Sequence, residues 1–118
     1  MRDAARDFAP EECCGLLLGR DAIEEARPAA NVDADPRRRF EIDPQTLIDA
    51  HRKARVGGLG VIGYYHSHPG GPAEPSETDR AMAHGDCKVW AIVGEEVVTF
   101  WRDDEEGFAP LPYVVEDR

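Results

Sequence analysis

Two histidines spaced two residues apart are the chemically most informative feature of the sequence. His66 and His68 end an apolar run, and side chains two residues apart on a strand point to the same side of a sheet. The two imidazoles would therefore converge on one point, which suits a divalent metal ion, above all zinc. A catalytic zinc takes three protein ligands and keeps a fourth position for water. The third ligand should be a carboxylate or a histidine, and Asp79, in the first turn of a predicted helix, is the candidate.

Each part of this pattern also has an ordinary structural explanation. An isolated H-x-H pair is common without a metal, and an S-x-x-D sequence at a helix start, here Ser76 to Asp79, usually only caps the helix. Glu74 and Glu77 are nearer to the histidines in sequence, but we expect Glu74 in a loop and Glu77 facing solvent. Two further histidines have no companion at ligand spacing and are expected to be structural or exposed: His51 and His84.

The combined pattern resembles a known motif. H-S-H-P, then S-x-x-D separated from the second histidine by seven residues, is similar to the JAMM motif of the MPN+ (JAB/MPN) metallopeptidase family. In this chain the motif residues are His66, His68, Ser76 and Asp79. The resemblance covers residues 10 to about 113, and the short form is similar to the prokaryotic members.

The family also has a glutamate on an early strand, followed by an apolar run and a glycine. Residues 12–19, E-C-C-G-L-L-L-G, resemble that element. Glu12 leads this run and is the assigned position, and Glu11 is the competing one.

The resemblance implies a role for each motif residue. His66, His68 and Asp79 would bind one zinc ion, with a bound water in the fourth place. Zinc lowers the pKa of such a water from 15.7 to ~7. Glu12 would take its proton as general base and pass it to the leaving amine. Ser76 would hydrogen-bond the oxyanion beside the zinc while also capping its helix.

The elements that would position these residues follow from apolar periods and turn residues. An Asp-Pro pair at 43–44 predicts a helix start, with Leu47, Ile48 and His51 on one face, and a Gly-Gly pair at 57–58 ends this helix. We expect helices at 2–8, 44–56 and 76 to about 85, and strands at 12–19, 22–30, 39–42, 59–65, 88–93, 97–102 and 109–115.

The irregular alternation of these elements predicts an α+β (mixed α/β) domain with a single central mixed β-sheet flanked by helices. The resemblance implies a JAMM/MPN-like, cytidine-deaminase-like architecture.

The composition describes one acidic domain, residues 1–118. The chain has 14 basic and 24 acidic residues and a net charge of −10. Nucleic acid is disfavoured as a partner because such binding needs clustered Lys and Arg, and the basic cluster here is only Arg37 to Arg39. No apolar run approaches the ~20 residues of a membrane span, so we expect no membrane partner.

The N-terminus and the cysteines indicate a cytoplasmic protein. Residues 1–8 carry charges where a signal peptide needs an apolar stretch. Three cysteines without a C-x-x-C favour a reducing compartment over a disulfide framework. Cys13 and Cys14 are expected to be small buried residues on opposite faces of a strand.

The resemblance implies hydrolysis of an amide bond after the C-terminal glycine of a small ubiquitin-like or sulfur-carrier protein, one form of which releases cysteine from a carrier adduct. The alternatives are a non-catalytic MPN-type scaffold or binding module, which usually lacks part of the ligand set, and a zinc peptidase acting on another peptide such as a cell-wall peptide. A nucleobase deaminase would show H-x-E and P-C-x-x-C, and neither occurs. The oligomeric state is not predicted.

Overall fold

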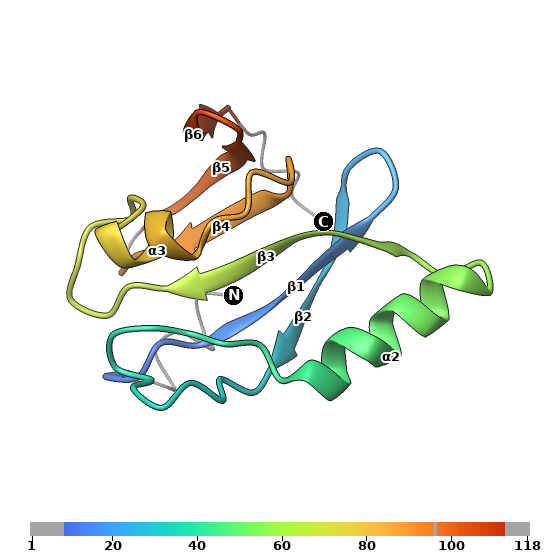
Figure 1. Ribbon diagram of the computed structural model, residues 1–118, viewed down its shortest axis with the longest axis horizontal. Coiled ribbons are helices and arrows are strands. Elements are labelled where there is room, and N and C mark those ends of the chain that lie inside the picture. Colours follow the sequence, from blue (N-terminus) through green and yellow to red (C-terminus); the bar gives the residue numbers. More distant parts are fainter. Residues whose placement is uncertain (1–8, 96, 113–118) are drawn as a thin grey trace.

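A six-stranded mixed sheet organises the chain (Figure 1). The computed structural model describes residues 9–95 and 97–112. Within them the strand order is β2-β1-β3-β4-β5-β6, and β3–β4 is the parallel pair while the other neighbours are antiparallel. The strands are β1 (Cys14–Gly19), β2 (Ile23–Ala29), β3 (Gly60–Ser67), β4 (Val89–Val93), β5 (Val98–Asp104) and β6 (Gly107–Leu111). The described helices are α2 (Pro44–Arg55) and α3 (Glu77–Met82). The predicted α+β class with one mixed sheet is confirmed.

The parallel pair brings distant segments to one end of the sheet. Parallel strands need a crossover connection, and here α3 lies within the connection from β3 to β4. The crossover therefore returns past the carboxyl end of β3, where the two histidines stand. On the other side, Cys14 of β1 pairs with His66 of the antiparallel β3. The segment that leads into β1 therefore ends beside the histidines.

Strand β1 is the centre of the core, because all six of its residues are buried. Cys13 and Leu17 pack on one face with Tyr65, while Leu16 packs on the other beneath α2. Cys14 lies in a separate buried cluster with aromatic residues. The two cysteines are 5% and 1% exposed, so the prediction of buried residues on opposite faces is confirmed.

The glycine in the C-G-L-L-L-G run has a steric reason. A Cβ on Gly15 would overlap the ring of Tyr65 and the carbonyl oxygen of Arg27. Only glycine therefore lets the neighbouring strands approach β1 at this point.

Most predicted elements are confirmed, including the Asp43 N-cap and Pro44 start of α2. The predicted strand 39–42 is wrong. Ile42 forms only an isolated bridge with Asn31, because the Asn31 side chain binds the carbonyl of Arg39 and the N–H of Glu41. These main-chain groups are then not available to a strand ladder.

Only part of the predicted face of α2 packs on the sheet. Leu47 and Ala50 pack onto the sheet, whereas Ile48 is 45% exposed and His51 is exposed. The buried stripe of α2 is therefore narrower than the apolar pattern indicates.

Several element ends differ from the prediction, among them those of α3 and β6. Helix α3 stops at Met82 rather than near 85, because the N–H groups of His84 and Gly85 donate to the buried Asp103 carboxylate instead of continuing the helix. Strand β6 begins at Gly107, two residues before the predicted start. The predicted helix 2–8 and the end of the predicted strand 109–115 lie outside the described residues.

Two further observations concern the helices and the cysteines. In the described part of the chain, no helix has the length and apolar character needed to cross a membrane. Cys13, Cys14 and Cys87 are all unpaired thiols, as the cysteine count predicts.

Candidate metal centre

Three side chains converge at the carboxyl end of β3. The Nε2 atoms of His66 and His68 lie 3.0 Å apart. The two carboxylate oxygens of Asp79 lie 3.1 Å from His66 Nε2 and 3.0 Å from His68 Nε2. A tetrahedral zinc with bonds of about 2.0–2.1 Å holds its ligand atoms roughly 3.3 Å apart. Two imidazole nitrogens and a carboxylate at these distances fit a divalent cation.

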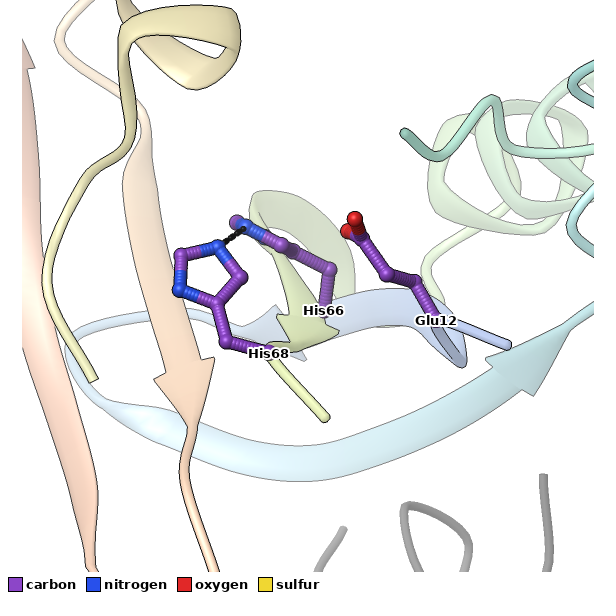
Figure 2. Close-up of side chains that lie close together, drawn as sticks. All are labelled: Glu12, His66 and His68. Atoms are coloured by element: carbon purple, nitrogen blue, oxygen red, sulfur yellow. Dashed lines mark hydrogen bonds between the residues drawn. The ribbon is translucent and has the colours of Figure 1, made fainter. Parts of the chain in front are cut away.

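Glu12 completes the group from the opposite side (Figure 2). Its carboxylate reaches over from the segment before β1 and lies beside the His66 ring. Glu12, His66 and His68 each offer one ligand atom within 4.8 Å of the others, which makes them a possible metal site. Glu12 is 6% exposed, whereas Glu11 is exposed, so the structure places Glu12 and not Glu11 beside the histidines.

The electrostatics of Glu12 differ from those of an ordinary glutamate. Burial raises the pKa of Glu12 from 4.5 to about 7, His68 acts in the opposite direction, and Asp79 raises it further. Its Oε1 atom is buried without a hydrogen-bond partner among the described residues. A carboxyl group with a pKa near neutrality can both accept and release a proton at physiological pH.

The other three groups, His66, His68 and Asp79, contact one another and shift one another's pKa. Burial lowers the pKa of His66. Burial also acts to lower the pKa of His68, but hydrogen bonds to Asp79 and to the Pro72 carbonyl outweigh it, and the net pKa is raised. Burial opposes ionisation of Asp79, yet hydrogen bonds from His66 and His68 hold its pKa well below the usual range. Asp79 therefore stays a carboxylate, the form that binds a cation.

Local structure at α3 orients Asp79. The Ser76 hydroxyl accepts the Asp79 N–H at 3.0 Å, and Asp79 Oδ2 accepts the Ser76 N–H at 2.9 Å, a capping box. The helix-cap explanation of S-x-x-D is thus correct, and the same bonds fix the carboxylate against the histidines. The Ser76 hydroxyl proton is not used by the cap and remains able to donate.

The loop after β3 orients His68. Its Nδ1 lies 2.9 Å from the Pro72 carbonyl, to which an Nδ1–H can donate. With a proton held on Nδ1, loss of the Nε2 proton would leave the Nε2 lone pair facing the candidate site, the arrangement usual for metal-bound histidines. Glu74 and Glu77 are exposed and away from this contact, as expected from the sequence.

Two residues around the site make contacts that the sequence does not predict. Phe40 stacks on His66, with ring centroids 4.3 Å apart and planes 14° from parallel. Ser67, between the histidines, is buried and accepts the Cys13 N–H at 2.8 Å. The spacing of these residues carries no signal of the contacts, because Phe40 lies in a loop and the partner of Ser67 is far away in the chain.

Solved structures of other proteins share the fold of this chain. A solution structure of a protein from Desulfitobacterium hafniense superimposes with a TM-score of 0.87 and 28% identity, covering 100% of this chain and 87% of that one. A JAB1/MPN domain protein from Archaeoglobus fulgidus has the same fold, with a TM-score of 0.61 and 22% identity over 94% of this chain and 85% of that one.

Sequence relatives define the family. The desampylase of Haloferax volcanii is 36% identical over 98% of this chain and 86% of that protein. A probable TtuB-protein conjugate cleaving protease of Thermus thermophilus is 41% identical over 60% of this chain and 48% of that protein. The model of the prokaryotic homologs of the JAB domain matches residues 1–104, and the chain belongs to this family. The predicted family and enzyme class, a JAMM-type metalloprotease, are thereby confirmed.

Proposed function

We propose that residues 1–118 form a single zinc-dependent protease domain that hydrolyses the amide bond after the C-terminal glycine of a small ubiquitin-like protein. The observation that carries the proposal is the convergence of two histidines and one ionised carboxylate beside a glutamate whose pKa is about 7. A non-catalytic scaffold would not require this complete and buried donor set.

The relatives support the substrate class. One is a desampylase and another is named as cleaving conjugates of the TtuB protein. By similarity, the substrates of this chain would be conjugates or C-terminal adducts of small ubiquitin-like or sulfur-carrier proteins, including adducts with cysteine. Three unpaired thiols fit a site of action in the reducing cytoplasm.

His66, His68 and Asp79 would hold the zinc ion. When bound, zinc would supply a Lewis acid that polarises the scissile carbonyl and makes a nearby water more acidic. This assignment uses the donors that already lie 3.0–3.1 Å apart. It leaves Glu12, whose carboxylate lies in the same site as the two histidines, for proton transfer.

Glu12 would act as the general base and then as the general acid. Its carboxylate would remove a proton from the attacking water and deliver that proton to the leaving amine nitrogen. Burial raises the pKa of Glu12, which favours holding the proton between its removal from water and its delivery to the amine. The hydroxyl of Ser76 would donate a hydrogen bond to the developing oxyanion.

The experiment uses a ubiquitin-like protein joined through its C-terminal glycine to a lysine side chain, and a second substrate with cysteine in place of lysine. The zinc-loaded protein is expected to cleave at least one of them and to lose this activity after chelation. Glu12→Gln should keep zinc but not turn over, while Glu11→Gln should behave like the wild type.

Three results would contradict the proposal. Equal rates with and without metal would exclude the zinc mechanism. A wild type unable to take up zinc would support the scaffold alternative. Loss of activity in Glu11→Gln but not in Glu12→Gln would show that the base is assigned to the wrong glutamate.

A further inference from the structure

The two histidines of the metal centre are held in different ways. His68 has its second ring nitrogen, Nδ1, at hydrogen-bond distance from the Pro72 carbonyl. His66 is 0% exposed, and its Nδ1 has no hydrogen-bond partner among the described residues. Metal-binding histidines almost always use that nitrogen to donate to a carbonyl, carboxylate or water, which orients the ring. Something else must therefore orient His66.

Aromatic rings enclose His66. Phe40 covers one face at a centroid distance of 4.3 Å and is itself 5% exposed. Trp90 meets the ring edge-to-face at 5.6 Å and 90°. Phe40 and Trp90 also contact each other, at 5.7 Å and 76°. Stacking on a flat ring defines the plane of the imidazole without using a polar atom.

Phe40 belongs to the segment between β2 and α2, which has no regular ladder of its own. The Asn31 side chain ties this segment together: its Nδ2 donates to the carbonyls of Glu12 and Arg39, at 2.9 and 3.0 Å. The Pro36 carbonyl accepts the Glu12 N–H at 2.7 Å. The segment that presents Phe40 to His66 is thus fastened to both main-chain groups of Glu12.

We propose that Phe40 is a positioning residue of the metal centre: its ring holds the His66 imidazole so that Nε2 faces Asp79 and His68. The inference rests on the proposed function as far as the metal is concerned. It extends that function, because a stacking contact replaces the hydrogen bond that would normally orient a metal-binding histidine, and because the same segment links His66 to Glu12.

The experiment compares Phe40→Leu with Phe108→Leu. Phe108 packs on Trp90 at 4.9 Å and belongs to the same cluster, but it has no ring contact with His66 among the described residues. Phe40→Leu is expected to bind zinc about 10–100-fold more weakly, measured by competition with a chromophoric chelator. Phe108→Leu should bind zinc like the wild type. Phe40→Tyr, which keeps the flat ring, should restore most of the affinity.

A second readout needs no metal. In the metal-free wild type, the ring protons of His66 should show an upfield shift from the stacked Phe40, with a single set of ring signals by NMR. Phe40→Leu should remove the shift and give several exchanging ring orientations. Thermal unfolding of each variant verifies that it is folded.

The outcomes separate the inference from the proposed function. Wild-type zinc affinity in a folded Phe40→Leu, or an equal loss in Phe108→Leu, would overturn the positioning role. If the wild type binds no zinc, the proposed function is refuted. If the His66 ring is nevertheless ordered in the wild type and loses this order in Phe40→Leu, the positioning role is supported.

Discussion

Glu12 should destabilise the metal-free protein at alkaline pH, and Glu12→Gln should relieve this. The pKa of Glu12 is raised from 4.5 to about 7 in the folded chain, so the folded state binds this proton more tightly than the unfolded state does. The contribution of the group to stability is then full below pH 4.5 and is lost as the pH rises through 7. Each pKa unit corresponds to roughly 1.4 kcal/mol, which gives about 3 kcal/mol for the whole change.

The measurement is urea unfolding of wild type and Glu12→Gln, both with a chelator, at several pH values between 5 and 8. The difference in the free energy of unfolding should grow by about 2–3 kcal/mol in favour of the variant over this interval. Glu11→Gln is the matched control, since Glu11 is exposed, and its unfolding should follow the wild-type pH dependence. If the free energies of unfolding of wild type and Glu12→Gln change with pH in parallel, burial of the Glu12 charge does not destabilise the fold and the reasoning is refuted.

Three further substitutions test other parts of the site. Asp79→Ala should weaken zinc binding by more than about 100-fold, measured by chelator competition, because it removes a proposed ligand; an unchanged affinity would shift the third ligand to Glu12. Ser76→Ala should cost about 1 kcal/mol of stability from the lost cap and lower kcat by about 10²–10³ from the lost oxyanion donor. If only the thermal stability falls, Ser76 is no more than a cap. Ser67→Ala should cost about 1–3 kcal/mol, because the Cys13 N–H loses its buried partner; denaturant unfolding measures this, and a neutral result would mean that water replaces the hydroxyl.

Local signals explain why so much of the site could be predicted. The paired histidines depend on the period of one strand, and the S-x-x-D cap is complete within four residues. Glu12 is assigned through the resemblance of its C-G-L-L-L-G run to the family's glutamate element, and the pairing of Cys14 with His66 brings it beside the histidines. Each of these inferences needs only one element and its immediate neighbours.

The missed contacts are all non-local. Phe40 and His66 come together through a loop whose path is determined by the Asn31 side chain, and no pattern around either residue records this. The wrong strand at 39–42 has the same origin: the alternating pattern is present, but Asn31 takes the hydrogen bonds that a neighbouring strand would need. The apolar pattern of a sequence does not show where a side chain takes the hydrogen bonds of a strand.

The metal centre and the stability of the fold are coupled through buried polar groups. Glu12 and Asp79 are two carboxyl groups at 6% and 3% exposure, and Asp79 raises the pKa of Glu12. A divalent cation held by His66, His68 and Asp79 would offset the repulsion between the two carboxylates and lower the pKa of Glu12. Zinc should therefore raise the melting temperature of the wild type by more than that of Glu12→Gln. The stability advantage of Glu12→Gln over the wild type at pH 8 should accordingly be smaller with zinc than with chelator. Thermal unfolding of both proteins with zinc and with chelator measures this coupling, and an advantage of the same size in both conditions would show that Glu12 does not sense the cation.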